Sequence, residues 1–286
     1  MPVVFKNPNL PDYFLDFPQV RADTPLAELP SVVQPFESGR VITFSNLRLD
    51  IDTAFWASLD TDRHPRLRKL SSRPPEGEET DQALDDRLRQ AELPAADKDR
   101  LRQEIARVYA QVLPIYERLF AGYAFTRRHA VWRLQTIMNE NMHVDTYEGR
   151  TADHFARLFI NLDDQPRIWK TSWPIADIYA RFADRVPPEA AASGDADLFR
   201  TQLNRRAFGA GPKEWWDNEP RHVVYFQPGE AWAVDSRQIA HQIFYGRRAV
   251  SIDFFVDVKS MRRPARHYLA MAGRLMRRTL VEPGQS

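Results

Sequence analysis

The chain has 286 residues, a formal net charge of +1 and no cysteine. The missing cysteines exclude disulfides, iron–sulfur clusters and thiolate zinc sites, and the balanced charge gives no indication of a nucleic-acid partner. Because no apolar run is long enough to span a bilayer and the N-terminus has no apolar signal region, we expect a cytoplasmic protein.

The N-terminal part begins with a proline-rich segment over residues 1–36, which predicts an extended arm laid on the surface. A strand is expected at 39–44 and a short helix at 52–59. Residues 71–81 have the composition of a loop. Apolar residues at helical spacing from 97 to 121 predict a long helix that packs on the outside of a sheet.

From about residue 127 short strands dominate the pattern, and we expect them at 130–142, 157–162, 167–170, 223–226, 231–234 and 249–256. Short helices are expected at 177–182 and 198–208, with a loop at 187–197. Repeated short strands after a helical start indicate a barrel or jelly roll. The predicted fold class is mixed α/β (α+β), with a double-stranded β-helix (jelly-roll) core. We predict one domain over 1–286, composed of an N-terminal arm and helical support (1–126), the jelly-roll core (127–260) and a C-terminal amphipathic helix (261–286).

The most informative motif is His143-Val144-Asp145, which a third candidate ligand, His241, follows much later in the chain. Two imidazoles and one carboxylate can occupy one face of an octahedral metal and leave the opposite face open, as in non-haem Fe(II) oxygenases. On a strand, residues two apart point to the same side, so one metal can meet both. The sequence therefore predicts His143, Asp145 and His241 as metal ligands and as the catalytic centre.

The chain resembles the Kdo hydroxylases, Fe(II)/2-oxoglutarate-dependent enzymes that act on the 3-deoxy-octulosonic acid sugar of lipopolysaccharide. The resemblance runs through the long helix and a series of short segments, at 36–41, 131–133, 142–145, 157–162, 166–169, 226–229, 239–241 and 269–280. It implies iron ligation by the triad and binding of the distal carboxylate of 2-oxoglutarate by Arg133 and Arg157. The segment 134–142 departs from the pattern, because the family usually has a longer stretch there, rich in lysine and arginine.

The cosubstrate needs a cation deep in the barrel, and the planar fork of arginine suits a carboxylate. Many oxygenases place this arginine about ten residues after the distal histidine, where this chain has Ser251. Arg157 is a natural candidate on its predicted strand, although it could instead pair with a protein carboxylate. Asp253 could pair with an arginine of the cosubstrate pocket or lie at a solvated edge. Arg133 could lie on either face of its strand. Asn161 shares the face of Arg157 and could bond to the cosubstrate or to a backbone group.

The predicted function is hydroxylation of an unactivated C–H bond with Fe(II), 2-oxoglutarate and O2, and with ascorbate as reductant. The resemblance suggests Kdo in a lipid A precursor as the substrate. Two alternatives stay open: a hydroxylase of another small molecule, such as an amino acid or a natural product, and a metal-binding jelly-roll protein without catalysis. The substrate would be a small molecule or a glycolipid, and the sequence does not indicate an oligomeric state.

The C-terminal segment, 262–280, is basic and amphipathic, with Leu269, Ala272, Met276 and Leu280 on one face. Such a helix could dock on the barrel or contact an anionic lipid surface. We expect weak, peripheral contact with the inner membrane through the arginines, while the apolar face stays on the protein.

Overall fold

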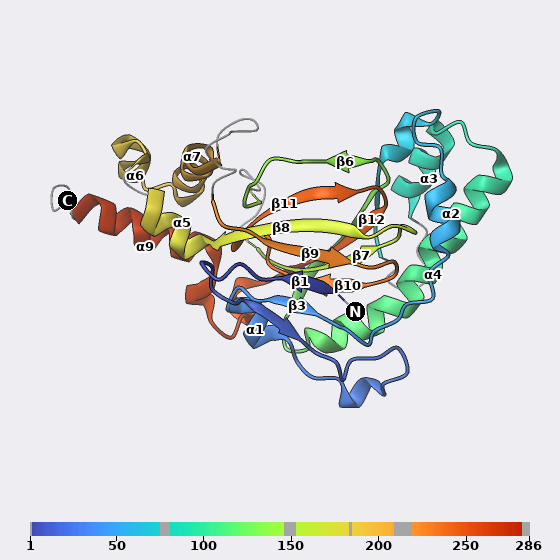
Figure 1. Ribbon diagram of the computed structural model, residues 1–286, viewed down its shortest axis with the longest axis horizontal. Helices are drawn as coiled ribbons and strands as arrows, with labels where there is room; N and C mark the ends of the chain where they lie inside the picture. Colours follow the sequence, from blue (N-terminus) through green and yellow to red (C-terminus); the bar gives the residue numbers. More distant parts are fainter. Residues whose placement is uncertain (1, 75–80, 146–152, 183–184, 209–218, 282–286) are drawn as a thin grey trace.

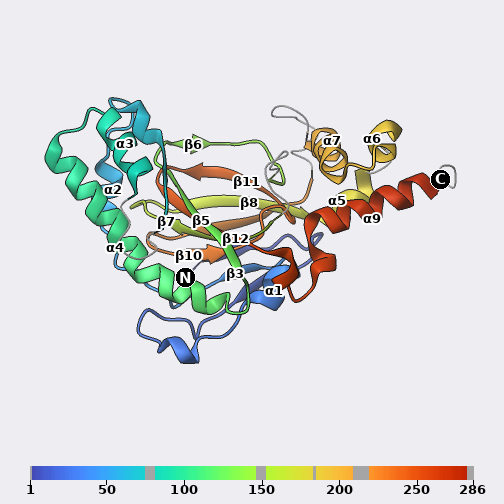
Figure 2. The same ribbon diagram turned by 180° about the vertical axis from the view of Figure 1, so that it is seen from behind.

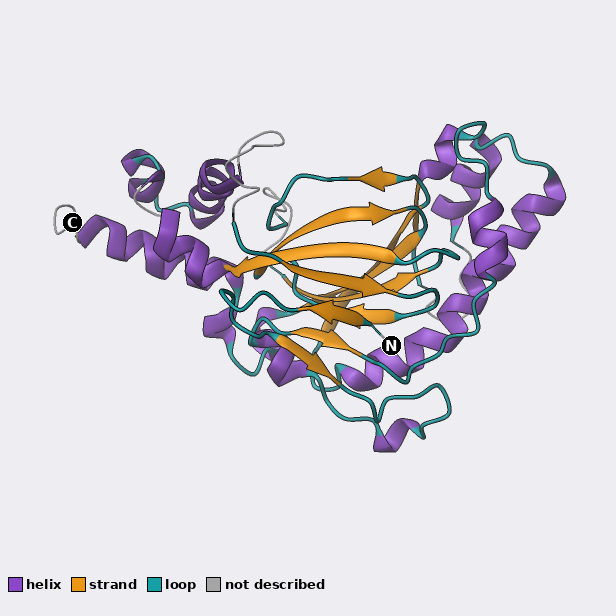
Figure 3. Ribbon diagram, in the orientation of Figure 1, coloured by secondary structure: helices purple, strands orange, loops and turns teal. Residues whose placement is uncertain are grey.

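The computed structural model describes residues 2–74, 81–145, 153–182, 185–208 and 219–281, and the side chains as far as Arg277. Two β-sheets face each other in the middle of the molecule, and helices gather at both ends (Figures 1 and 3). No helix of the described residues is both long enough and apolar enough to cross a membrane.

The smaller sheet has five strands, in the spatial order β1 (Val3–Phe5), β9 (His222–Phe226), β8 (Arg167–Pro174), β11 (Ile239–Gly246) and β6 (Ile137–Met138). The larger sheet has seven, in the order β2 (Phe14–Asp16), β3 (Val41–Thr43), β10 (Ala231–Ala233), β7 (His154–Asn161), β12 (Ala249–Val256), β5 (Phe125–Arg133) and β4 (Lys69–Ser72). All pairings are antiparallel except β2 with β3.

Aromatic rings join the inner faces of the two sheets. Trp232 of β10 stacks on Phe226 of β9, with centroids 3.8 Å apart, and on Phe159 of β7 at 5.4 Å. Trp169 of β8 meets the edge of Trp232 at 5.4 Å. This aromatic layer fills one end of the space between the sheets and leaves a cavity beside it, which the polar residues of the site line.

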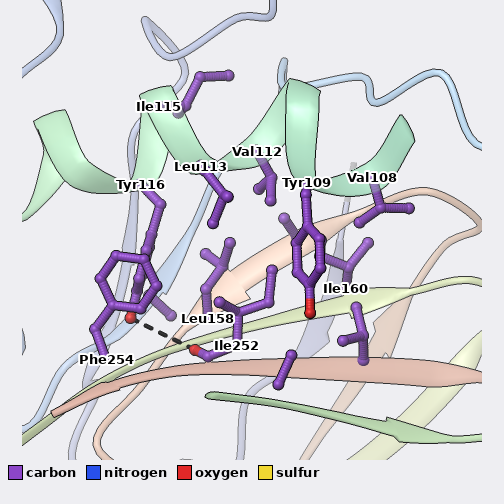
Figure 4. Packing of buried hydrophobic residues seen from close by; sticks show 14 of the residues in the cluster. Val108, Tyr109, Val112, Leu113, Ile115, Tyr116, Leu158, Ile160, Ile252 and Phe254 are labelled. Carbon is purple, nitrogen blue, oxygen red and sulfur yellow. Dashed lines mark hydrogen bonds between the residues drawn. The ribbon is translucent and has the colours of Figure 1, made fainter. Parts of the chain in front are cut away.

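The helices on one end support the larger sheet (Figure 2). They are α2 (Thr53–Ser58), α3 (Gln82–Gln90) and the long α4 (Ala95–Leu119), whereas the short α1 (Val33–Glu37) lies lower down, beside β3. On β7 and β12 the side chains alternate, so Leu158 and Ile252 face α4 while Arg157 and Asp253 face the cavity. Val112 and Tyr116 of α4 pack against this apolar face (Figure 4), which confirms the predicted long helix outside a sheet.

A helical lobe lies at the opposite end, where α5 (Ile175–Phe182), α6 (Pro188–Ala192), α7 (Ala196–Phe208) and α9 (Tyr268–Val281) pack together (Figure 1). Met271, Ala272 and Met276 of α9 are buried in a cluster with α5, α6 and α7. The C-terminal helix therefore docks mainly on neighbouring helices rather than on the strands. The short 3-10 helices are η1 (Leu26–Glu28), η2 (Pro65–Arg68), η4 (Val258–Ser260) and η5 (Pro264–Arg266).

Several expectations need correction. The segment 187–197 was expected to be a loop but contains α6, because Pro188 suits the first turn of a helix. The predicted strand 130–142 ends at Arg133 and resumes only as β6. The N-terminal arm, predicted to lie on the surface, contributes one strand to each sheet: β1 pairs with β9 and β2 pairs with β3. Most of the loop expected at 71–81 lies outside the described residues.

Candidate metal centre

Three potential metal ligands converge between the two sheets. His143, Asp145 and His241 each offer one ligand atom, and these atoms lie within 4.8 Å of one another. His241 belongs to β11, and His143 forms an isolated bridge with it, in which each backbone amide donates to the carbonyl oxygen of the other residue at 3.0 and 2.8 Å. Asp145 lies beyond this bridge and outside any strand. The predicted triad is assembled, although no single strand carries both members of the His-x-Asp pair.

The two imidazole rings are oriented by their own backbone. Nδ1 of His143 donates to the carbonyl oxygen of Asn141 at 2.7 Å, and Nδ1 of His241 donates to that of Ile239 at 3.0 Å. Because a carbonyl can only accept, the proton of each neutral ring is fixed on Nδ1 and Nε2 is left to bind a metal. Trp169 stacks on His241, with centroids 5.1 Å apart and planes at 19°. Two imidazole nitrogens and one carboxylate fit Fe(II).

Asp145 is held through one of its two carboxylate oxygens. Oδ2 accepts a hydrogen bond from the Ser236 hydroxyl at 2.6 Å and another from the Arg157 guanidinium. Oδ1 lies 3.4 Å from Nε2 of His143, on the side of the other ligands. Arg157 is itself fixed by Asp253, whose Oδ1 accepts from its Nε at 2.6 Å. The arrangement turns Oδ1 toward the metal position and favours ligation by one oxygen.

Helix α7 supports the backbone between the two ligands. Asn204 accepts from the amide of Val144 at 3.3 Å and donates to the carbonyl oxygen of the same residue at 3.2 Å. Arg200, which is fully buried, donates to the carbonyl oxygen of Asp145 at 2.7 Å. These bonds fix a segment that no strand supports, and they link the helical lobe to the centre.

The three ligands have strongly shifted pKa values. Burial opposes the charge of Asp145, but the Arg157 guanidinium and the imidazoles outweigh it and hold its pKa well below its usual range. Burial likewise opposes the charge of His143, yet the hydrogen bond and charge of Asp145 raise its pKa to about 9. Burial and the charge of His143 lower the pKa of His241 to about 4. The ionised Asp145 and the neutral His241 are therefore ready to bind a cation, whereas a bound metal must displace the second proton of His143.

The triad lines a cavity of about 750 Å3 whose walls are rich in cations. Arg167 of β8 is the most unusual of them, because it is 3% exposed and both its Nε and its Nη1 lack a hydrogen-bond partner. Burial and the nearby charge of Arg133 lower its pKa to about 10. Among the described residues, no carboxylate forms an ion pair with Arg133 or Arg167. A buried guanidinium without an anion is costly, so this end of the cavity is built to receive one.

The other predicted site residues have different surroundings. Arg157 lines the cavity, but it is paired with Asp145 and Asp253, which is the alternative that the sequence left open. Ser251 lines the cavity, and its hydroxyl lies 3.3 Å from Oδ2 of Asp253. Asn161 does not line the cavity, and its amide donates to two backbone carbonyl oxygens at 2.9 and 3.0 Å. The structure thus brings Arg133, Arg157 and Ser251 to the cavity and does not support a cosubstrate contact for Asn161.

Sequence reasoning missed four residues of the site: Arg167, Ser236, Arg200 and Asn204. Arg167 could have been predicted from the sequence. It lies two residues before Trp169 on a predicted strand, so the two side chains point to the same face of that strand. No signal marked the others, since their contacts cross from a loop or from α7 to the ligand segment.

A triad of two imidazoles and one carboxylate, in a cavity with unpaired arginines, defines a candidate non-haem iron centre. The chain matches the family model described as 3-deoxy-D-manno-oct-2-ulosonic acid (Kdo) hydroxylase over residues 23–279. It therefore belongs to the Kdo hydroxylase family, and the family predicted from the sequence is confirmed. No curated protein matches the chain.

Solved structures of the Kdo hydroxylase KdoO, a non-haem Fe(II) alpha-ketoglutarate-dependent dioxygenase, have a similar fold. The complex with succinate and Fe(III) is 17% identical, with a TM-score of 0.69 over 96% of this chain and 99% of that chain. The complex with alpha-ketoglutarate and Fe(III) gives 17% identity and 0.69 over 94% and 96%. The cobalt(II) complex gives 16% identity and 0.70 over 96% and 99%. At this identity the likeness shows the fold alone.

Proposed function

We propose that this chain is an Fe(II)/2-oxoglutarate-dependent hydroxylase of the Kdo sugar in a lipid A precursor. The observation that carries the proposal is the convergence of His143, Asp145 and His241 at one end of a cavity that also holds the unpaired Arg133 and Arg167. A site that only stored metal would have no need of buried cations beside it. Family membership supplies the substrate class.

The order of the strands supports a double-stranded β-helix for the core. From β7 to β12 the chain passes between the two sheets: β7, β10 and β12 lie in the larger sheet, and β8, β9 and β11 in the smaller one. The strands β5 and β6 divide between the sheets in the same way. This alternation is the connectivity of a jelly roll, and it encloses the cavity between the sheets.

Arg133 and Arg167 are the proposed anchors of the distal carboxylate of 2-oxoglutarate. They face the same cavity from the two sheets, and Arg167 has unused donors there. This replaces the expected pair of Arg133 and Arg157, because the guanidinium of Arg157 already serves two carboxylates. Ser251, between the metal position and Arg133 along the strands, is placed to contact the cosubstrate.

With iron and 2-oxoglutarate bound, the centre supplies the chemistry that inserts one oxygen atom of O2 into a C–H bond, with succinate and carbon dioxide as coproducts. The residues of the chain bind and orient the reactants. Arg157 and Ser236 keep Asp145 ionised and turned toward the metal position. Trp169 and Phe159 provide an apolar wall that limits access of water. Ascorbate would keep the iron reduced.

Mass spectrometry tests the proposal. The wild type, incubated with Fe(II), 2-oxoglutarate, ascorbate and a Kdo-bearing lipid A precursor, should add one oxygen atom to the sugar and release succinate. The variant His143→Ala should do neither. Arg167→Met and Arg133→Gln should bind 2-oxoglutarate at least tenfold more weakly in anaerobic titrations of the visible charge-transfer band, whereas Arg87→Gln, an exposed control on α3, should not. Oxygen insertion by His143→Ala, or unchanged affinity in both arginine variants, would contradict the assignment.

The enzyme is proposed to act at the cytoplasmic face of the inner membrane, where such a glycolipid would be embedded. The C-terminal segment presents exposed arginines at 262, 263, 266, 274 and 277. Its apolar residues are buried in the helical lobe, so attraction would be electrostatic, at about 1 kcal/mol for each cation near an anionic leaflet. Binding should therefore be weak and sensitive to salt.

Co-sedimentation with anionic vesicles tests this contact. The wild type should bind at low salt and dissociate at high salt, and a variant with Arg266→Ser, Arg274→Ser and Arg277→Ser should lose most of the binding. A matched variant with three exposed arginines changed elsewhere, Arg87→Ser, Arg205→Ser and Arg206→Ser, should bind like the wild type. Equal binding by both variants would remove the C-terminal segment from the proposal.

A further inference from the structure

A group of cations lies along the outer edge of the cavity, beside the proposed cosubstrate anchor Arg133. Lys69 and Arg73 lie on and just after β4, and Arg127 lies near the start of the neighbouring β5. All three line the same cavity as the metal triad, and all three are exposed at its rim. We call Lys69, Arg73 and Arg127 the edge cluster.

The pairing of β4 with β5 brings the edge cluster to one face. Lys69 lies opposite Arg133, and Ser71 opposite Val131. The intervening Leu70 and Trp132 are fully buried on the other face, under the helices. The cations therefore point into the cavity because the apolar alternation of both strands faces the core.

Within the described part of the chain, the positive charge of the edge cluster has no carboxylate partner. Among the residues described, no carboxylate forms an ion pair with any of its three members. By contrast, two nearby arginines are neutralised: Arg128 pairs with Glu117 at 2.8 Å, and Arg157 pairs with Asp253. Arg133 and Arg167 are assigned to the cosubstrate, which leaves the edge cluster to the acceptor.

Arg127 is held in place for such a role. Its guanidinium lies over the ring of Phe255 on β12, 3.7 Å from the centroid. Stacking fixes the plane of the guanidinium while its N–H groups stay in the plane and can meet a carboxylate or phosphate with two parallel bonds. The cavity, at about 750 Å3, is also much larger than a five-carbon diacid needs, so an acceptor has room beside the cosubstrate.

We infer that the edge cluster is a second anion-binding subsite, which receives an oxyanion of the acceptor other than the group at the reacting carbon. The acceptor would then be a molecule with at least two anionic groups, positioned by the nearer group at the metal centre and by the farther one at the rim. The inference rests on the proposed function for the identity of the acceptor. The oxyanion is either a phosphate ester or the carboxylate of a further acidic sugar, and one experiment separates these sources.

The kinetic test compares the wild type with an edge variant, Lys69→Gln/Arg73→Gln/Arg127→Gln. The control carries the same change of charge on exposed arginines outside the cavity, Arg87→Gln/Arg205→Gln/Arg206→Gln. With the Kdo-bearing lipid A precursor, the KM of the edge variant should rise at least tenfold while kcat changes less than twofold. Its anaerobic titration with 2-oxoglutarate should match the wild type. A KM equal to that of the control variant would overturn the inference.

Dephosphorylation of the acceptor identifies the oxyanion. If it is a phosphate, its removal should raise the wild-type KM about as much as the edge substitutions do and have little further effect on the edge variant, because the two changes remove the same interaction. If removal leaves the wild-type KM unchanged while the edge variant still shows the rise, the oxyanion is a carboxylate.

A binding test without acceptor separates this inference from the proposed function. Inorganic sulfate, titrated against chloride at equal ionic strength, is added to the full chain loaded anaerobically with Fe(II) and 2-oxoglutarate. It should raise the Tm of the wild type and of the control variant but not that of the edge variant. Equal Tm shifts in all three would remove the subsite even if hydroxylation were observed. A selective shift would support the subsite even if another acceptor proved correct.

Discussion

The buried guanidinium of Arg157 has two carboxylates of the protein as its partners. It lies on the cavity face of β7, close to the metal position, and a free arginine there would bind an anionic ligand. In the structure it joins Asp145 to Asp253, and burial of its charge is balanced by these two carboxylates, which raise its pKa. We therefore propose that Arg157 positions Asp145 and does not bind the cosubstrate.

Substitution of Arg157 should weaken metal binding before it affects the cosubstrate. In Arg157→Gln, Asp145 keeps the Ser236 hydrogen bond but loses the charge that holds it ionised, so iron affinity should fall by about 10- to 100-fold. Anaerobic competition with a chelator measures this. A circular dichroism spectrum like that of the wild type confirms folding, and unchanged iron affinity in a folded variant would contradict the positioning role.

The sequence was sufficient to predict a triad that the structure brings together, because the pattern is local: two residue types at a fixed spacing and a later histidine. It was not sufficient for the partners of Arg157. The register that sets Asp253 opposite Arg157 across β7 and β12 depends on how two distant strands pair. Arg133 lines the cavity, whereas the amide of Asn161 donates to the carbonyl oxygens of Gln165, just after β7, and of Phe226 at the end of β9.

At the scale of elements, α4 is the main support of the larger sheet. Tyr116 is fully buried and its ring meets those of Phe254 and Phe120 at 4.5 and 4.9 Å. Its hydroxyl makes only a long hydrogen bond, 3.5 Å, to the carbonyl oxygen of Ile252 (Figure 4). Most of its contribution to stability should therefore come from packing.

Two substitutions at Tyr116 separate packing from hydrogen bonding. Tyr116→Ala should lower the free energy of unfolding by about 3–5 kcal/mol, as expected for loss of a buried aromatic ring, whereas Tyr116→Phe should cost about 1 kcal/mol or less. Gln103→Ala, on the exposed face of the same helix, is the control and should be nearly neutral. Urea unfolding provides the measurement, and similar losses for Ala and Phe would mean that the hydroxyl, not the ring, stabilises the sheet.

Elements with strong periodicity were predictable and those made by tertiary pairing were not. The long helix was expected at 97–121 and spans 95–119, because apolar residues recur at helical spacing over its whole length. In contrast, β6 has two residues and exists only because it pairs with β11. A strand of two residues is too short to show an alternation of apolar and polar side chains. The strand predicted at 130–142 therefore included the turn between β5 and β6.

For the whole molecule, two buried histidines should make stability depend on pH. Burial lowers the pKa of His154 to about 3, and burial with the charge of Arg237 lowers that of His267 to about 4. The unfolded chain takes up protons near pH 6.5, whereas the folded protein does not. The contribution of each of these two histidines is therefore complete above about pH 7 and falls as pH drops toward the folded pKa, by up to about 1.4 kcal/mol per pH unit for each.

The measurement is urea unfolding between pH 7.5 and pH 5, a range in which most carboxylates stay ionised. The wild type should lose stability steadily over this range. His154→Gln should be less stable at pH 7.5 but lose less on acidification, because the proton-binding difference of His154 is gone. Parallel pH dependence in the two proteins would show that His154 does not contribute.

The sheet order has a consequence for behaviour at high concentration. Each sheet ends in short strands, namely β1 with 3 residues, β6 with 2, β2 with 3 and β4 with 4. Short edge strands offer little unpaired backbone to a second molecule, so they discourage aggregation through strand addition. Strand β1 pairs with β9 and covers its backbone, so the five residues of β9 do not form an exposed edge. An N-terminal tag or truncation that displaces Val3–Phe5 would turn this edge into a point of self-association.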